Sequence, residues 1–435
     1  MKIKNFFFSY NLMVIIIKTI NDILWIFVVI VILLNSIYFS IKLKFPQSRI
    51  KEMIKTLKEK DVKSGISSLD TLFMSLAAKI GVGSLAGISF AIYYGGIGTL
   101  FWIFIFSFFI SINSYLENYL AIKYKVKDGK FYKGGPAYYI KNGLNKKTLS
   151  FIYAVILIFT FLFGFLTIQN NTITKFVNIS YDIPIVITSL IITIISFYFI
   201  LRGLKSIFKL CNNIVPVMSI VYIIIGIIVL VLNFDRIDNF FIDIITSAFN
   251  HKSFFGGFLS CLIISIQKSI FSSEAGLGTG AISSATSSCD NPKKQGYIGI
   301  IGTYFINIVI TFLTGFIVYF SDYKSMLFNN VNGIEITSYA FSYHLGSFGE
   351  AILLILIVLF AFSSIVTGYY YLESNLKLFT NSKLVIFILK LVTIIVLFYG
   401  GILPSNTIWN IIDLCVGVLS LINIYAIFKL RHFIN

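Results

Sequence analysis

Long apolar stretches separated by short polar connections run through nearly the whole chain of 435 residues. A helix that crosses a bilayer needs about 20 apolar residues, so the pattern predicts an all-α, multi-pass membrane protein with about eleven transmembrane helices. Several stretches exceed one bilayer thickness, which predicts tilted, broken or protruding helices. The expected spans are residues 22–42, 67–95, 97–122, 149–170, 182–201, 207–233, 255–287, 296–320, 338–375, 383–400 and 405–430.

Connections rich and poor in lysine and arginine mostly alternate along the chain. The connections 42–63 and 123–147 carry eight such residues each, whereas 95–96 carries none and 321–337 carries one. Because basic loops remain in the cytoplasm, we expect the N-terminus outside and the C-terminus inside a bacterial plasma membrane. Residues 1–20 are expected to be an N-terminal extension, either an uncleaved leader or an upstream stretch if translation begins at Met13. Residues 21–435 are expected to form one transmembrane domain.

Two spans carry charges and clustered glycines within their apolar runs. The first contains KIGVGSLAGISF, residues 79 to 90, and the second contains SIQKSIFSSEAGLGTGAISSATSS, residues 265 to 288. They lie five spans apart and therefore run in opposite directions through the membrane. Glycine-interrupted segments at matching positions of two halves indicate an inverted-repeat transporter, although small residues also simply allow close helix packing. We expect a first repeat over about 67–233 and a second over about 255–430.

A broken helix in a membrane leaves backbone groups that the protein or a ligand must pair. The positive end of a half-helix suits a carboxylate, and exposed carbonyl groups suit Na⁺. A charge at mid-membrane costs about 2.5–3.5 kcal/mol on an insertion scale, so Lys79 and Glu274 should face protein or water. We expect Glu274 to pair with Lys79 or Lys268. A purely structural ion pair is an equally good interpretation of either lysine.

Composition supports the membrane assignment, because 57% of the residues are hydrophobic and 12% are charged, against about a quarter charged in soluble proteins. The net charge of +17 comes from loop lysines, so no nucleic-acid partner is expected. The scattered cysteines and histidines predict no metal site, disulfide framework or cofactor. They are Cys211, Cys261, Cys289, Cys415, His251, His344 and His432. The spans contain no catalytic cluster, and no phosphate-binding motif of an ATP-driven pump occurs, so an enzyme is not expected.

Five motifs in order resemble the alanine or glycine:cation symporter family of the amino acid–polyamine–cation superfamily, and the similarity covers nearly everything after residue 20. They are SLAAKIGVGSLAGISFAIYYGGIGTLFWIFIFSF, KYKVKDGKFYKGGPAYYIKNGL, FSSEAGLGTGAISSA, LFAFSSIVTGYYYLE and IWNIIDLCVGVLSLINI. The resemblance implies a leucine-transporter-like core of five plus five inverted helices, with one extra helix at the N-terminus. It also implies uptake of a small amino acid coupled to Na⁺ or H⁺.

The resemblance also implies roles for individual residues. Backbone N–H groups of one glycine-rich turn would hold the substrate carboxylate, and polar groups on two other helices would line the site. These substrate-binding residues would be Gly83, Ser84, Leu85, Gln169, Asn170, Ser272, Ser273 and Gly276. Carbonyl and hydroxyl oxygens would bind the cation. The cation-binding residues would be Ala77, Ile80, Ser363 and Ser364.

Two departures from the family pattern lie within the implied site. Ser84 and Ser273 stand where the family usually has Asn, so each half of the site carries a hydroxyl in place of a carboxamide. The expected function is Na⁺-coupled symport of alanine or glycine into the cell. The alternatives are a diverged homologue that acts as a facilitator or amino-acid sensor, and an H⁺-coupled permease for another small amino acid.

Overall fold

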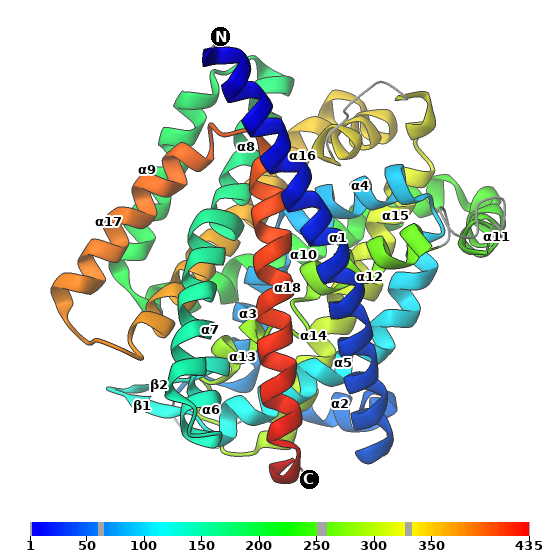
Figure 1. The fold of residues 1–435 in the computed structure, drawn as a ribbon. Coiled ribbons are helices and arrows are strands. Elements are labelled where there is room, and N and C mark those ends of the chain that lie inside the picture. Colours follow the sequence, from blue (N-terminus) through cyan, green and yellow to red (C-terminus); the bar gives the residue numbers. More distant parts are fainter. Residues whose placement is uncertain (1, 60–64, 250–258, 327–332, 435) are drawn as a thin grey trace.

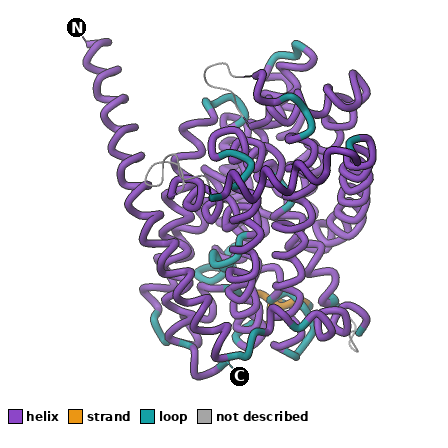
Figure 2. The backbone as a smooth tube through the Cα atoms, turned by 90° about the vertical axis from the view of Figure 1, so that its right-hand side faces the viewer, coloured by secondary structure: helices purple, strands orange, loops and turns teal. Residues whose placement is uncertain are grey.

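The protein is a bundle of helices in the computed structural model, which describes residues 2–59, 65–249, 259–326 and 333–434 (Figures 1 and 2). The α-helices are α1 (Lys2–Lys42), α2 (Ile50–Lys58), α3 (Ser68–Lys79), α4 (Ile88–Gly95), α5 (Thr99–Lys123), α6 (Pro136–Gly143), α7 (Lys147–Thr160), α8 (Leu166–Tyr181), α9 (Ile185–Arg202), α10 (Leu204–Leu232), α11 (Ile237–Ala248), α12 (Leu259–Ser273), α13 (Thr279–Ser284), α14 (Pro292–Tyr304), α15 (Thr311–Tyr319), α16 (Gly333–Leu376), α17 (Lys383–Gly400) and α18 (Ser405–Lys429).

The remaining elements are short. Three wide, π-helical turns are η2 (Gly83–Gly87), η3 (Phe161–Phe165) and η7 (Phe305–Ile310), and the 3₁₀ turns are η1 (Pro46–Ser48), η4 (Phe234–Arg236), η8 (Tyr323–Met326) and η9 (Arg431–Phe433). Strands β1 (Val126–Asp128) and β2 (Phe131–Lys133) form an antiparallel hairpin near the C-terminal end of the bundle (Figure 1). Lys133 and Lys377 both form ion pairs with Asp128, so the hairpin is attached to the chain just after α16.

Among the described residues, nine helices are long and apolar enough to cross a membrane, or ten if one bent pair counts as a single span. The predicted all-helical membrane class is therefore confirmed, whereas the count of eleven is not. The difference lies in the expected span 255–287, because α12 ends at Ser273 and its apolar part is shorter than a full span. Residues 250–258 lie outside the described part of the chain.

Several expected boundaries differ from the structure. The segment 149–170 extends through α7, η3 and α8 as one span of 35 residues, because polar residues beyond 170 are buried against neighbouring helices. The segment 338–375 belongs to α16, which has a kink at Gly346. Helix α1 is continuous through the expected boundary at residue 20. Sequence analysis did not anticipate α2, α6 or α11, which lie in the connections between spans.

The first glycine-rich span is broken as predicted. Helix α3 begins with a capping box in which Ser67 and Asp70 satisfy each other's backbone N–H groups, and it ends at Lys79. The segment Gly83–Gly95 continues at an angle of 59° to it. The turn η2 and helix α4 thus form a second half-helix whose N-terminal end faces the middle of the bundle.

The second glycine-rich segment is also broken, between α12 and α13. Three residues there have positive φ: Glu274 (54°), Gly276 (97°) and Gly278 (86°). Glycine adopts these angles without strain, and the glutamate does so at a cost. The two breaks therefore occur where the sequence pairs glycines with an intramembrane charge.

Helices α1 and α18 run side by side along one side of the bundle, and their C-terminal ends lie at the end opposite to the N-terminus (Figure 1). Helix α5 packs along α14, while α3 contacts α10 and α16. Helices α9, α10 and α17 expose many large apolar side chains, as expected of helices that face lipid. The two breaks lie in the interior between these layers.

Candidate functional site

Side chains from other helices pair the backbone groups freed at the first break. The Gln169 side chain of α8 accepts a hydrogen bond from the N–H of Val82 through its Oε1 atom (3.0 Å). Thr314 of α15 donates to the carbonyl of Ser84 (3.0 Å), and the Ser84 hydroxyl donates to the carbonyl of Gly81 (2.9 Å). The break is thus held by three polar side chains, as an opening in a membrane helix requires.

Two glycines of the break are surrounded so closely that a side chain would not fit. A Cβ atom on Gly81 would lie 2.6 Å from Gln169 Nε2 and 2.8 Å from Ser364 Oγ, and one on Gly83 would lie 2.5 Å from the Phe271 ring. Phe271 stacks on Phe165 with ring centroids 5.0 Å apart. Glycine at 83 is therefore required by its neighbours. The Gln169 side chain and the Phe271 ring therefore lie directly against this turn.

The residues expected to bind a cation come together where α3 ends. The Ser364 hydroxyl lies 2.8 Å from the carbonyl oxygen of Ala77 and 3.2 Å from that of Ala78, and the Ser363 hydroxyl lies 3.4 Å from Ala77. Ile80 follows three residues after Ala77, and its ψ of 67° takes the backbone out of the helix. Carbonyl and hydroxyl oxygens from α3 and α16 are thus concentrated at the break.

Asn423 and Tyr153 hold the second break. Asn423 of α18 donates to the carbonyl of Gly276 (2.9 Å), and Tyr153 of α7 donates to the carbonyl of Leu277 (2.5 Å). Glu274 accepts from the hydroxyl of Thr279 (2.5 Å). The backbone carbonyls of this break are therefore fixed by side chains from two helices.

Glu117 of α5 is a buried carboxylate that sequence analysis did not select. It accepts from Asn423 Nδ2 (2.7 Å) and from the backbone N–H groups of Gly276 and Gly278. Its side chain pairs the donors of the second break, as Gln169 does at the first. An acid within the expected span 97–122 was the available signal, because ionisable residues inside membranes mark functional positions.

Lys79 lies between the two carboxylates, although no ion pair within 4.0 Å links them among the described residues. Its Nζ atom lies 3.3 Å from the position that a Cβ atom on Gly280 would take, and it is attracted by both Glu274 and Glu117. All three charged side chains are at most 4% exposed. The charge of the first broken helix is thereby coupled to the acids of the second.

Lys268 lies elsewhere. Its Nζ atom is 4.7 Å from the centroid of the Trp409 ring, and its charge acts on Asp413. The acid associated with Lys268 is therefore Asp413 of α18. The expected alternative of a Lys268–Glu274 pair does not match this arrangement, because the basic side chain whose charge acts on Glu274 is Lys79.

The remaining predicted residues separate into two groups. Asn170 points away from the break and donates to Ser189 of α9 and Leu397 of α17. Ser273 bonds to the carbonyl of Ser269 in its own helix. By contrast, the Ser272 hydroxyl is fully buried and has no hydrogen-bond partner among the described residues. Leu85 is fully buried in η2.

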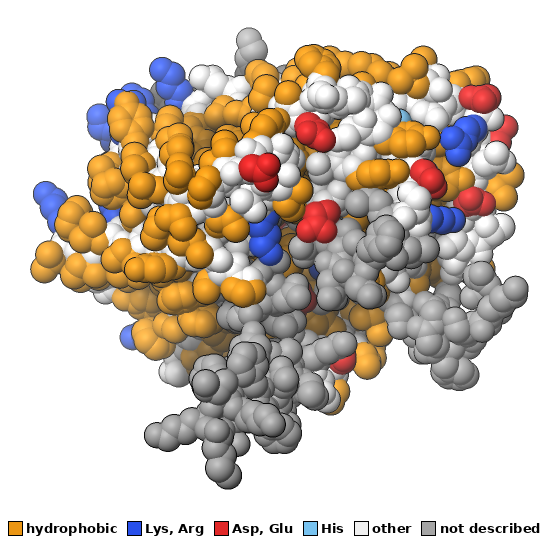
Figure 3. Space-filling view, turned by 90° about the horizontal axis from the view of Figure 1, so that it is seen from above, with side chains coloured by type: hydrophobic (Ala, Val, Ile, Leu, Met, Phe, Trp, Pro, Cys, Tyr) orange, Lys and Arg blue, Asp and Glu red, His pale blue; other side chains and the backbone are white. Residues whose placement is uncertain are grey.

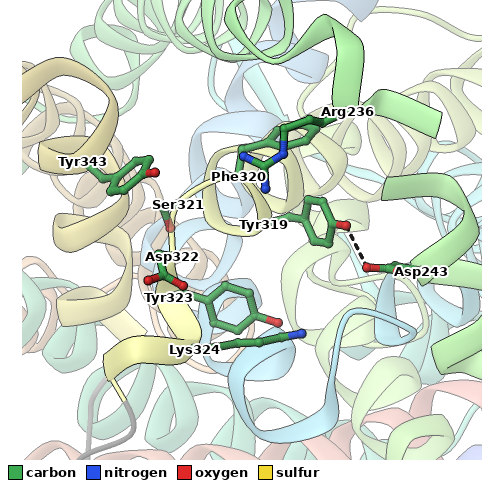
Figure 4. Close-up of a pocket in the computed structure, with 9 residues that line it drawn as sticks. All are labelled: Arg236, Asp243, Tyr319, Phe320, Ser321, Asp322, Tyr323, Lys324 and Tyr343. Carbon is green, nitrogen blue, oxygen red and sulfur yellow. Dashed lines mark hydrogen bonds between the residues drawn. The ribbon is translucent and has the colours of Figure 1, made fainter. Parts of the chain in front are cut away.

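A separate polar cavity of about 350 Å³ lies between α11, the end of α15 and the segments η8 and α16 (Figure 4). It brings cations and acids together with three tyrosines; its lining residues are Arg236, Asp243, Tyr319, Phe320, Ser321, Asp322, Tyr323, Lys324 and Tyr343. Tyr319 donates to Asp243 (2.7 Å). Burial, together with the nearby charge of Asp243, raises the pKa of Tyr323 to about 12. Acidic and basic side chains also gather on one side of the face at the N-terminal end of the bundle (Figure 3).

A family match extends over almost the whole chain: residues 10–435 match the sodium:alanine symporter family. The chain belongs to this family. Members of the family are sodium and amino-acid symporters, so the protein is a multi-pass membrane transporter and not an enzyme. Both broken segments and all five motifs lie inside the matched region.

Curated relatives of this symporter family match over most of their length. The chain is 35% identical over 417 residues to the Probable sodium/glutamine symporter GlnT of Bacillus subtilis (strain 168), covering 94% of this chain and 87% of the relative. It is 30% identical over 427 residues to the Sodium/alanine symporter AgcS of Methanococcus maripaludis, covering 95% and 94%. The Amino-acid carrier protein AlsT of Bacillus subtilis is 30% identical over 415 residues, covering 95% and 88%.

A solved structure shows the fold of this symporter. MhsT, crystallised in complex with L-phenylalanine, superposes with a TM-score of 0.59 at 13% identity, covering 84% of this chain and 89% of MhsT. The match confirms the predicted leucine-transporter-like fold. At this level of identity the likeness concerns the fold alone.

Proposed function

We propose that the protein imports a small neutral amino acid, alanine or glycine, together with Na⁺ by alternating access. One observation carries the proposal: the hydroxyls of Ser363 and Ser364 donate hydrogen bonds to the carbonyls of Ala77 and Ala78, where α3 is interrupted. Neutral oxygen ligands of this kind suit a monovalent cation. In this proposal Ala77, Ile80 and the two serines bind Na⁺.

The amino acid would bind beside the cation, between the two breaks. The half-helix that begins at Gly83 directs its positive end at this region, so N–H groups of Gly83, Ser84 and Leu85 would hold the substrate carboxylate. The Ser272 hydroxyl supports the proposal because it is buried with no hydrogen-bond partner in the described part of the chain, so a ligand could bond to it. Gln169, Ser273 and Gly276 would complete the site, while Asn170 would hold α8 in place behind Gln169.

The size of the space favours a small substrate. Phe271, Phe165 and Gln169 crowd the turn at Gly81–Gly83, which leaves little room for a carboxamide side chain such as that of glutamine. Relatives named for alanine and for glutamine share the fold, so competition between these amino acids is the informative measurement. We expect alanine and glycine to compete for uptake at lower concentrations than glutamine.

The central experiment is uptake of labelled alanine into proteoliposomes with and without an inward Na⁺ gradient. We expect accumulation only with the gradient. The double variant Ser363→Ala/Ser364→Ala should raise the half-saturating Na⁺ concentration more than it changes the order of substrate preference. Ser107→Ala/Ser265→Ala is the matched control, because each serine donates to a carbonyl of its own helix. An unchanged Na⁺ dependence in the first double variant would place the ion elsewhere.

The same assay separates the alternative functions. A facilitator would equilibrate alanine without accumulating it, and a sensor would bind alanine without moving it. Accumulation driven by a pH gradient in the absence of Na⁺ would indicate the H⁺-coupled permease. The proposed orientation, with the N-terminus outside and the C-terminus in the cytoplasm of a bacterial cell, is tested by labelling single cysteines placed at each end.

A further inference from the structure

A groove of about 540 Å³ lies on the outside of the bundle between α1 and α18. Its lining is almost entirely apolar and aromatic: Phe27, Val31, Leu34, Asn35, Tyr38, Leu421, Ile424, Tyr425 and Phe428. The two helices touch where Gly417 approaches Leu24 and where Trp25 Nε1 donates to the carbonyl of Asp413 (3.2 Å). They touch again at the Tyr38 and Phe428 rings, 5.5 Å apart. The groove is thus a fixed feature between two packed helices.

Basic side chains surround the C-terminal end of this groove. Two of them lie over aromatic rings that line it. Arg431 lies 4.6 Å from the centroid of the Phe428 ring, and Lys429 lies 5.8 Å from that of Tyr425. Lys146 Nζ donates to the Tyr425 hydroxyl (2.6 Å). Lys42 Nζ contacts the backbone carbonyl of Arg431. Four cations thereby converge on one end of the groove: they come from the end of α1, the residue before α7, the end of α18 and η9.

None of these four cations has a carboxylate partner within 4.0 Å in the described part of the chain. They contact carbonyl and hydroxyl oxygens and aromatic rings. Like charges held together repel one another, so an anion from outside the chain would stabilise the cluster. A soluble anion would satisfy the charges and leave the apolar groove unused. A phospholipid with an anionic headgroup would neutralise the cations and also fill the apolar groove with an acyl chain.

We propose that this groove binds an acyl chain of an anionic phospholipid whose phosphate is held by Lys42, Lys146, Lys429 and Arg431. Basic pockets between transmembrane helices typically bind such headgroups. The exposed aromatic side chains Tyr38 and Tyr425 lie at the level of the cations, where amphipathic rings are favoured at a membrane interface. The lipid would hold α1, the helix outside the repeated core, against α18. This inference does not depend on the transported substrate.

The test uses full-length protein, stripped of lipid in mild detergent and titrated with phosphatidylglycerol or with phosphatidylcholine of the same chains. Bound lipid is counted by native mass spectrometry, and the unfolding midpoint is followed in parallel. We expect phosphatidylglycerol to bind more tightly and to raise the midpoint further. Each cation near an anionic headgroup contributes about a fivefold change, so Lys42→Gln/Lys429→Gln/Arg431→Gln should weaken phosphatidylglycerol binding roughly a hundredfold.

Four further variants keep the result interpretable. Lys51→Gln/Lys130→Gln/Lys293→Gln removes the same charge from exposed lysines elsewhere and should bind phosphatidylglycerol as the wild type does. Leu421→Trp fills the groove and should reduce binding of both lipids. If the triple groove variant does not fold, Lys42→Arg/Lys429→Arg keeps the charges and should retain binding, whereas the single variant Arg431→Gln should weaken it about fivefold.

Three outcomes would overturn the proposal. The first is equal phosphatidylglycerol binding by the two triple variants. The second is displacement of the lipid by inorganic phosphate alone, which would indicate a soluble-anion site. The third is a lipid-free dimer that is lost in Leu421→Trp, which would show that a second copy occupies the groove.

Discussion

Gly83 is constrained by a neighbouring ring, since its own backbone angles are not unusual. A Cβ atom on Gly83 would lie 2.5 Å from Phe271, whereas one on Gly87 would meet nothing within 4 Å. Substitution of Gly87 is therefore the control for substitution of Gly83. Gly83→Leu should abolish substrate uptake and binding while leaving membrane insertion intact, and Gly83→Ala should reduce both. Near-normal uptake by well-expressed Gly83→Leu would remove this turn from the site.

The control for this prediction is Gly87→Ala, which should transport alanine at close to the wild-type rate. A rescue variant sharpens the test. Gly83→Ala/Phe271→Leu restores the space that the added methyl group occupies, so part of the lost uptake should return. Loss of uptake in Gly87→Ala would instead show that the wide turn itself tolerates no substitution.

Glu117 should be as important to the second break as Gln169 is to the first. Its carboxylate accepts from Gly276, Gly278 and Asn423, and a carboxamide has one acceptor oxygen where the carboxylate has two. Glu117→Gln leaves a buried donor unpaired, which costs about 1–3 kcal/mol, and should lower both the unfolding midpoint and alanine uptake. Glu350→Gln, at a carboxylate that accepts only from Ser342, should change uptake little.

Residue types near the breaks were predictable, but side-chain directions were not. Gln169 and Asn170 were selected together, yet adjacent residues of a helix point about 100° apart, so only one of them reaches the break. Glu117 is 157 positions from Glu274 along the chain, and no local pattern shows that α5 brings the two carboxylates to one lysine. The partner of Lys268 depended in the same way on the position of α18.

At the scale of elements, Asn171 connects α8 to the end of α17. Its Nδ2 atom donates to the carbonyl of Gly400 (3.2 Å), the last residue of α17, and to that of Leu403 (2.6 Å) just beyond it. The last carbonyls of a helix have no partner inside the helix. Asn171→Ala should destabilise the protein by about 1–3 kcal/mol, seen as a lower unfolding midpoint in detergent. Asn178→Ala, at an exposed amide of the same helix that bonds to Ile183, should leave the midpoint unchanged.

The breaks themselves were predictable at this scale, because glycines and a charge in one apolar run are costly without a structural reason. The ends of the spans were less predictable. Residues 171–181 are polar enough to be taken for a loop, yet they continue α8 because backbone carbonyls of Gly401 and Leu403, just beyond α17, pair their side chains. Helices in the connections, such as α11, carry too few residues to be distinguished from loops by apolar length.

For the whole molecule, the number of ions per cycle is the quantity to measure. With one Na⁺ and one zwitterion, one charge crosses per cycle, and about 150 mV supplies about 3.5 kcal/mol. That energy supports roughly 300-fold accumulation before any Na⁺ gradient is added. We expect about one charge per alanine in proteoliposomes, since Ser84 and Ser273 lack the carboxamides that a second cation site would use.

The matched comparison is Ser84→Asn/Ser273→Asn, which restores the residues usual in the family. Charge per alanine above one in this variant, with one in the wild type, would support the single-ion proposal. A wild-type ratio near two, or uptake without current, would contradict it. Removing both the potential and the ion gradient should reduce accumulation to equilibration in either protein.

The three wide turns have a consequence for how such a molecule can move. Each holds one residue more than an α-helical turn: η2 contains Ser84, η3 precedes Gln169 by one turn, and η7 precedes Thr314 by one turn. The extra residue can move from one turn to the next along the helix, and the helix stays continuous when it does so. Every residue it passes rotates by about 100°. Slip of this kind would turn Gln169 or Thr314 off the first break with both ends of the helix left in place.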